Sequence, residues 1–403
     1  MFRAGARARD GEEQPALILS VYPRIVCLAS PGKYPFYSAH CPMNLLIITP
    51  LYPPALGGAA TYFKQLAPCL VEHDEITQLT VLTERMPGQP QVQGDGKLRL
   101  LRRLPNRISS GQKSFVLHSA TYILTQLWFA INLRALVRNY AVDIVHFHTR
   151  YRGRWFYHAL RALPVPVVAD LRDKLSDPAQ LAEVADCVLC CGDGVYAFAL
   201  AGGCPPAQAA LIPNLFMPPP LPAPEAVTLC KRRYKLEDHP YLLFIGDITY
   251  NKGVYDLLEA YRGWQKHHPD TRLVLAGVNQ EGTRFLNQVQ QTPGASYLGR
   301  ISHADVLCLM RGAEMVVLPS RSEGLPTVIL EAIAMETKVI CPPGIPEFER
   351  HLPNFVLPEV STPAILEMFN KVWTYPYRPT YPFAEHHIHR VGEALIRLYT
   401  SLG

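Results

Sequence analysis

The stretch PSRSEGLPTVILEAIA, residues 319–334, decides the fold of this chain because it reads as a turn that leads from a buried strand into a helix. Gly324 permits a backbone turn that other residues resist, and Pro326 suits the first position of a helix. The run after it contains strong helix formers. We therefore expect Glu323 in the loop and Glu331 about one turn into the helix, with seven residues between them.

The start of this helix predicts an anion site. Its first N–H groups have no partner within the helix, and such ends attract phosphate. A carboxylate in the loop and another in the helix could accept hydrogen bonds from hydroxyls on either side of a diphosphate. A nucleotide-sugar has that layout: ribose, diphosphate, sugar. The alternative is an ordinary strand-to-helix junction whose glutamates are solvated.

The stretch resembles the E-x7-E motif of retaining glycosyltransferases with the GT-B fold, of the family-four, group 1 type. The resemblance continues in residues 43–61, 146–148, 185–214 and 244–347. It implies an α/β protein with two Rossmann-like, doubly wound domains that face a central cleft. It also implies a C-terminal helix that crosses back to the first domain.

The resemblance assigns roles to the residues of the motif. Glu331 is expected to hold the ribose hydroxyls, and Glu323 the hydroxyls of the donor sugar. Lys252 follows the strand YLLFI and a glycine turn, where a lysine can reach phosphate as a point charge. Together with the N–H groups of Leu325 and Thr327, it would stabilise charge on the leaving diphosphate.

One position departs from the family pattern. The family has an arginine directly after the glycine of that turn, where this chain has Asp247. Arg321 and Arg300 are the nearest candidates by motif position to replace it, since either could present a bidentate fork to phosphate. No Asp-x-Asp motif stands in a suitable loop. We therefore expect no metal site and no cofactor.

The first half carries the acceptor side of the expected site. The strand DIVHFHT ends in His146 and His148, and ligands gather at the carboxyl ends of strands in open sheets. The resemblance gives His148 a contact with the sugar. The resemblance also places the loop with Gly57 and Gly58, after the first strand, near the acceptor and the donor sugar, and the alternative is a plain tight turn.

Two further features of this half have functional and structural interpretations. Arg172 and Asp173 follow the strand VPVVADL. They are either a second polar group of the site at this edge of the sheet or a surface ion pair. The family often has serine where Gly192 stands.

The length of 403 residues predicts two domains. Residues 1–42 read as an extension, because Pro23 and Arg24 interrupt their apolar run. We expect a first domain over 43–217, a second over 225–380, and a crossover helix within 381–403. The net charge of +5 does not favour nucleic acid, and ten scattered cysteines are typical of a reduced, cytoplasmic protein.

A long helix is predicted over residues 115–138. Its apolar positions 116, 120, 123, 124, 127 and 131 recur at helical spacing, which favours a helix buried against the sheet. His118, Gln126 and Asn132 argue against a membrane span, because polar groups are costly in lipid. Peripheral contact with the inner face of a membrane remains open, since local basic clusters attract acidic lipid.

The sequence as a whole predicts a metal-independent, retaining glycosyltransferase. Its partners would be a nucleotide-sugar donor and a sugar, lipid-linked or polysaccharide acceptor, in glycoconjugate synthesis. A GT-B epimerase or phosphorylase would use the same fold. A noncatalytic binding or scaffold protein is the alternative of another class, and Asp247 is the residue that favours it.

Overall fold

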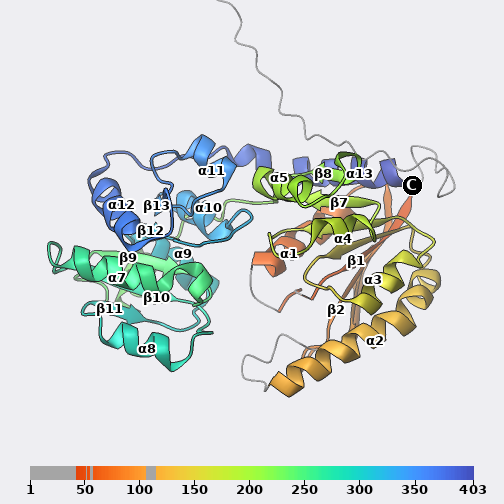
Figure 1. The fold of residues 1–403 in the computed structure, drawn as a ribbon, viewed down its shortest axis with the longest axis horizontal. Helices are drawn as coiled ribbons and strands as arrows, with labels where there is room; N and C mark the ends of the chain where they lie inside the picture. Colours follow the sequence, from red (N-terminus) through yellow and green to blue (C-terminus); the bar gives the residue numbers. More distant parts are fainter. Residues whose placement is uncertain (1–41, 51, 55–57, 106–114) are drawn as a thin grey trace, which may run out of the picture.

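The structure is a computed structural model that describes residues 42–50, 52–54, 58–105 and 115–403. These residues form two α/β lobes, each built around one sheet (Figure 1). Apart from Pro42, the predicted extension lies outside the described residues, as does Gly57. Residues 212–223 contain no helix or strand and connect the lobes, and the predicted domain limits stay predictions.

The first lobe holds an eight-stranded sheet with the order β3-β4-β2-β1-β5-β6-β7-β8. All neighbours pair in parallel except β3 and β4, which are antiparallel. Its inner strands are nearly continuous apolar runs, as parallel strands covered on both faces require. The strands are β1 (Met43–Ile48), β2 (Ile76–Glu84), β3 (Val92–Asp95), β4 (Leu98–Leu104), β5 (Ile144–His148), β6 (Val167–Leu171), β7 (Cys187–Cys190) and β8 (Ala209–Leu211). The helices are α1 (Gly58–Val71), α2 (Phe115–Asn139), α3 (Arg154–Arg161), α4 (Pro178–Ala182) and α5 (Asp193–Ala201).

The second lobe holds a five-stranded, all-parallel sheet with the order β11-β10-β9-β12-β13. The strands are β9 (Tyr241–Ile245), β10 (Arg272–Ala276), β11 (Ala295–Tyr297), β12 (Met315–Val317) and β13 (Lys338–Ile340). The helices are α6 (Pro224–Arg233), α7 (Val254–Gln265), α8 (Thr283–Gln290), α9 (His303–Gly312), α10 (Thr327–Ala334), α11 (Pro346–His351) and α12 (Thr362–Thr374). Short 3-10 turns are η1 (Pro206–Gln208) in the first lobe, η2 (Tyr250–Lys252) in the second lobe and η3 (Phe383–His386) before the last helix.

The last helix, α13 (Ile388–Leu402), returns to the first lobe as predicted (Figure 1). Its apolar face, with Val391, Leu395 and Leu398, belongs to the same buried cluster as β1 and α1. Gly392 allows a close approach, because a Cβ there would lie 2.6 Å from the sulfur of Cys69 on α1. The final segment of the chain therefore completes the core of the first lobe.

Helix α2 contradicts the predicted burial of its apolar stripe. The side chains of Ile123, Leu124, Leu127 and Ile131 are exposed by 51%, 54%, 38% and 72%. The buried face is the opposite one, with Phe129, Leu133, Leu136 and Val137. Helix α2 thus has two apolar faces, and only one of them packs on the sheet. No described helix is long and apolar enough to cross a membrane.

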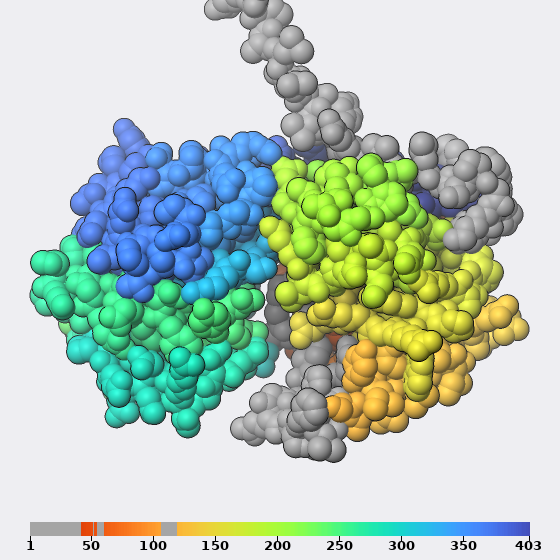
Figure 2. Space-filling model, in the orientation of Figure 1, coloured from red at the N-terminus to blue at the C-terminus, as the bar shows by residue number. Residues whose placement is uncertain are grey.

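The two lobes touch (Figure 2), and loops that follow strands of both sheets meet there. The loop after β12 reaches the loop after β6, since a Cβ on Gly324 would lie 2.5 Å from the carbonyl oxygen of Arg172. The Nζ of Lys174 donates to the carbonyl of Gly344 at 3.3 Å. In open α/β sheets this edge is where ligands bind.

Candidate active site

Two loops of the second lobe bring Lys252 and Glu323 together. Lys252 ends the turn after β9, and Glu323 lies in the loop after β12. Gly253 follows Lys252 with φ +70°, and a Cβ there would overlap the carbonyl oxygen of Pro319. Because only glycine allows this approach, the loops pack closely enough for the Lys252 ammonium to donate a hydrogen bond to the Glu323 carboxylate.

Glu331 lies in the second turn of α10 and contacts a residue that the sequence did not suggest. The Nε2 atom of His303, at the start of α9, lies 2.9 Å from Oε1 of Glu331. This hydrogen bond raises the pKa of His303. Thr327 is the first residue of α10, and Pro326 is its N-cap rather than its first position. The Glu331 side chain is 15% exposed and therefore remains accessible.

A cavity of about 290 Å³ lies between the lobes beside this helix start. Residues of both lobes and of the connecting segment line it. They are Thr61, Tyr62, Gln65, Leu215, Phe216, Met217, Pro218, Pro219, Pro220, His303, Thr327 and Glu331. The cavity therefore contains Glu331 and Thr327, two of the predicted donor-binding residues.

The arginines proposed to replace the family's arginine differ in their surroundings. Both terminal nitrogens of Arg321 donate within the second lobe, one to Asp256 at 2.6 Å and one to the carbonyl of Tyr250 at 2.8 Å. Its guanidinium is therefore bonded within the second lobe, and its role at the diphosphate stays a prediction. Arg300 is exposed, and Asp247 is exposed and accepts from Gln280 at 3.0 Å.

His148 ends β5 and is only 5% exposed. Burial lowers its pKa to about 3, so the ring is neutral at ordinary pH. The backbone N–H of Arg150 donates to Nδ1 at 2.9 Å, which assigns the ring proton to Nε2. His146 lies deeper in the lobe, where its Nδ1 is 2.6 Å from the hydroxyl of Tyr399 on α13. Of the two histidines, His148 is thus the one with a hydrogen-bond donor to offer.

Arg172 lies inside the site rather than in a surface pair with Asp173. Its guanidinium donates to Asp170 at 3.3 Å and to the side chain of Asn214, and stacks 3.5 Å from the ring centre of Tyr62. Burial alone would raise the pKa of Asp170, but Arg172 and the nearby His146, whose Nε2 lies 3.4 Å from the carboxylate, hold it at about 2. The surface ion-pair interpretation is therefore wrong, because Asp173 instead accepts from a backbone N–H two residues on.

The departure at Gly192 has a structural reason. Glu347 of α11 reaches across from the second lobe, and its Oε1 accepts from the backbone N–H of Asp193 at 2.6 Å. A Cβ on Gly192 would lie 2.5 Å from that oxygen. Arg350 adds an ion pair to Asp193 at 2.6 Å. A larger residue at position 192 would displace this contact between the lobes.

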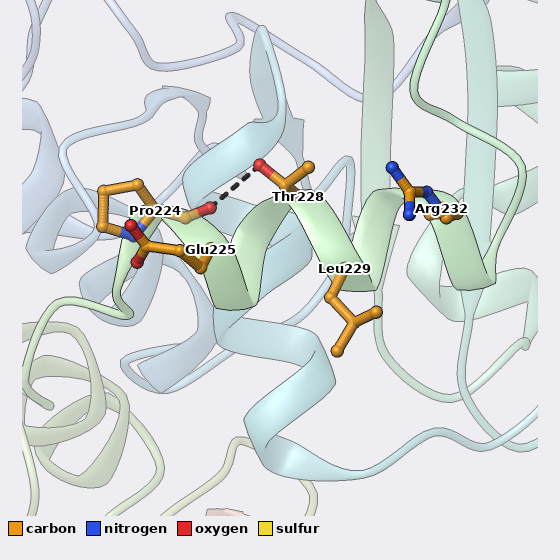
Figure 3. A pocket seen from close by; sticks show the side chains of 5 residues that line it. All are labelled: Pro224, Glu225, Thr228, Leu229 and Arg232. Atoms are coloured by element: carbon orange, nitrogen blue, oxygen red, sulfur yellow. Dashed lines mark hydrogen bonds between the residues drawn. The ribbon is translucent and has the colours of Figure 1, made fainter.

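A further hollow, of about 360 Å³, lies along α6 (Figure 3). One helix supplies all of its lining: Pro224, Glu225, Thr228, Leu229 and Arg232. The hydroxyl of Thr228 donates to the carbonyl of Pro224 within the helix. Since none of the predicted site residues lies there, we assign it no part in the chemistry.

Sequence reasoning missed His303, Tyr62 and Glu347. His303 lies three residues after the candidate Arg300, which was the only local signal for it. The other two depend on contacts between lobes. Among the residues that the structure describes, no three His, Cys, Asp or Glu side chains are grouped to hold a metal ion.

Two family models match the chain, one in each lobe. Glycosyltransferase Family 4 matches residues 56–216, and Glycosyl transferases group 1 matches residues 230–372. A glycogen synthase of Mycobacterium tuberculosis is 31% identical over 102 residues, 25% of each chain. An alpha-D-kanosaminyltransferase of Streptomyces kanamyceticus is 25% identical over 187 residues, 43% of this chain and 48% of that protein. The chain thus covers between a quarter and a half of the length of these relatives.

Solved structures resemble the chain over nearly its whole length. A sucrose-phosphate synthase from Thermosynechococcus elongatus superposes with a TM-score of 0.66 at 17% identity, covering 88% of this chain and 94% of that one. The Anabaena protein HepE, in complex with UDP and glucose, gives 0.60 at 14% identity, covering 89% and 97%. At these identities the likeness shows the fold. Together with the family models, it shows that the chain belongs to the group 1, family-four glycosyltransferases and has the GT-B fold.

Proposed function

We propose that this glycosyltransferase moves a sugar from a nucleotide-sugar donor to an acceptor hydroxyl with retention of anomeric configuration. One observation carries the proposal. Glu331 and Thr327 of the second lobe and Tyr62 of the first line one cavity at the start of α10. A helix start favours phosphate there, and the carboxylate supplies an acceptor for ribose hydroxyls.

The donor would extend from this cavity toward Lys252 and Glu323. Before it binds, the Lys252 ammonium is held by the Glu323 carboxylate. A diphosphate that takes over Lys252 would free Glu323 to accept hydrogen bonds from the donor sugar. The N–H groups of Leu325 and Thr327 would share the charge that builds on the leaving diphosphate, and Gly324 keeps that loop close to the first lobe.

The first lobe would supply the acceptor side. The neutral His148 has its proton on Nε2, so it would donate to a sugar hydroxyl near the reacting carbon without bringing a charge. Gly58 begins α1, the helix that carries Tyr62 into the cavity, and Gly57 precedes it. Asp170 is fully buried and bonded to Arg172, so it is a poor candidate for an enzyme nucleophile. This favours attack by the acceptor on the face that the diphosphate leaves.

Metal independence is part of the proposal. Its support is that Lys252 and a helix start can offset the diphosphate charge without an ion, and that the carboxylates of the described site are spread over separate elements. The acceptor is proposed only as a class: a sugar, a polysaccharide or a lipid-linked sugar. A lipid-linked acceptor implies a cytoplasmic protein that contacts the inner face of a membrane.

A noncatalytic binding or scaffold role is the second candidate, and one observation favours it. Asp247 occupies the position of the family's arginine, and the Arg321 guanidinium is bonded to Asp256. If no cation replaces the missing arginine, the diphosphate is held by Lys252 and backbone N–H groups alone. Arg172 and Arg300 are two other cations in loops that follow strands.

The test begins with a thermal-shift screen of the full chain against nucleoside diphosphates and nucleotide-sugars. The best donor is then used in a transfer and hydrolysis assay, and the anomeric configuration of the product is read by NMR. The proposal predicts donor binding and a product with the configuration of the donor. An inverted product would overturn retention. Absence of donor binding in the wild type, with binding gained in Asp247→Arg, would establish the scaffold role instead.

A further inference from the structure

The exposed face of α2 forms a continuous surface that the proposed chemistry does not use. Of the large apolar side chains that are exposed among the described residues, four lie on α2, and every other described helix carries at most one. They are Ile123, Leu124, Leu127 and Ile131. Helical positions advance about 100° per residue, so these four fall within one arc of about 100°. Exposed apolar groups gathered in this way mark an interaction site.

The same arc changes from apolar to basic toward the end of the helix. Arg134 and Arg138 lie within it by the same spacing, and both are exposed. With the described residues, neither forms an ion pair. The whole helix, residues 115–139, contains no Asp or Glu. The face is therefore apolar along its middle and positively charged at its end.

The neighbouring helix α3 extends the surface with the same chemistry. The side-chain amide of Gln126 on α2 accepts from the backbone N–H of Phe156 at 3.0 Å and donates to the carbonyl of Arg152 at 2.9 Å. These bonds fix the start of α3 against the middle of α2. That start carries Arg154, which is exposed, and Trp155, which is 45% exposed.

Charge is distributed unevenly along the chain in a way that fits this surface. Residues 96–169 hold twelve Lys or Arg and one acidic residue, Asp143. The segment thus carries +11, while the complete chain carries only +5, so the remainder is net negative. The acidic residue, Asp143, lies just before β5, and its carboxylate accepts from the backbone N–H of Asn44 on β1 at 2.7 Å.

We propose that the exposed face of α2, with the start of α3, docks onto an anionic lipid bilayer. Charge complementarity selects this occupant, because an apolar arc that ends in arginines matches a surface with hydrocarbon below and phosphate above. The apolar side chains would enter the boundary of the acyl chains. Arg134 and Arg138 would stay at the level of the phosphates, and Trp155 suits the interface. Figures 1 and 2 show α2 along the lower edge of the first lobe, where its outward face is not covered by another described helix.

This inference rests on the proposed function only for the reason to dock: on a bilayer, the acceptor side of the protein would meet a lipid-linked acceptor. The docking itself can be measured without any sugar transfer. If vesicles bind but no donor is used, the proposed function fails and the surface stands. If transfer proceeds but vesicles do not bind, the surface fails alone.

The experiment is co-sedimentation of the full chain with phosphatidylcholine vesicles, with and without phosphatidylglycerol. We expect binding to the anionic vesicles that weakens with salt. Arg134→Gln with Arg138→Gln should lower the partition coefficient about 30-fold, since each basic residue near such a surface contributes about a factor of five. Leu124→Gln with Ile131→Gln should lower it at least about tenfold and leave the salt dependence in place.

A matched control comes from α6, where Leu229 and Arg232 are also exposed. The pair Leu229→Gln and Arg232→Gln should bind vesicles like the wild type, and melting curves should show that every variant is folded. The proposal is overturned if the wild type does not bind anionic vesicles or if the α2 variants bind as well as the control. Self-association that Leu124→Gln with Ile131→Gln abolishes, without vesicle binding, would assign the face to a second copy.

Discussion

The two glutamates of the 319–334 stretch should differ in what their removal costs. Glu331→Ala takes away the carboxylate that lines the cavity beside the helix start, and its side chain is 85% shielded, so solvent replaces it poorly. A hydrogen bond to a charged group contributes about 1.5–3 kcal/mol. Affinity for a free nucleoside diphosphate should therefore fall roughly 10- to 100-fold.

Glu323→Ala should not weaken the binding of the free nucleotide. The Glu323 carboxylate pairs with the Lys252 ammonium and places a negative charge near the expected diphosphate. Its removal frees the ammonium for phosphate, so the affinity for the nucleotide should stay constant or rise. Turnover of the nucleotide-sugar should still fall, because the proposed partner of the sugar hydroxyls is lost.

The assay is calorimetric titration with the nucleoside diphosphate that binds best, followed by steady-state kinetics with the matching nucleotide-sugar. Glu367→Ala is the control, because Glu367 is an exposed glutamate on α12. Equal losses of nucleotide affinity in Glu331→Ala and Glu323→Ala would refute the division of roles. So would an unchanged affinity in Glu331→Ala.

Three further predictions follow from the contacts of the site. Gly324→Ala should lower turnover roughly 10- to 100-fold, because its Cβ would press on the carbonyl oxygen of Arg172 in the first lobe. Calorimetry should show an unchanged affinity for the nucleotide. Normal turnover would contradict this prediction. Arg300→Ala should weaken diphosphate binding about tenfold more than Arg321→Ala, since Arg321 is bonded to Asp256, and the reverse order in titration would contradict it. His148 has a pKa near 3 in the fold, below its ordinary value of about 6.5, so the unfolded chain binds the extra proton between these values. Stability should fall as pH drops through that range, by up to about 1.4 kcal/mol per pH unit from this residue, and denaturation of His148→Gln should show a smaller slope.

The strand-to-helix junctions could be predicted because their signals are local. Gly324 and the apolar run after it predicted a loop followed by α10, and Glu331 lies in that helix as expected. The glycine turn after β9 predicted a lysine beside the same edge. The meeting of Lys252 with Glu323 then follows from the parallel order of β9 and β12 in one sheet.

Contacts that join distant segments could not be read from the sequence. Helical spacing shows that Leu124 and Ile131 share a face, but α2 also has Phe129 and Leu133 on the other side, and spacing does not say which face meets the sheet. One of the two interpretations of Arg172 paired it with its neighbour in the chain, Asp173. The real partners were set by the strand edge and by Asn214, 42 residues away.

The return of α13 to the first lobe has a consequence for synthesis. The hydroxyl of Tyr399 bonds to His146 across 253 residues, and the apolar face of α13 closes the cluster around β1 and α1. While the second lobe is being made on the ribosome, the first lobe has emerged without this cover, and its apolar surface is open to aggregation or to a chaperone. Folding of the first lobe is thus completed by a helix that is made after the second lobe, and a truncation that removes α13 would damage the lobe that was made first.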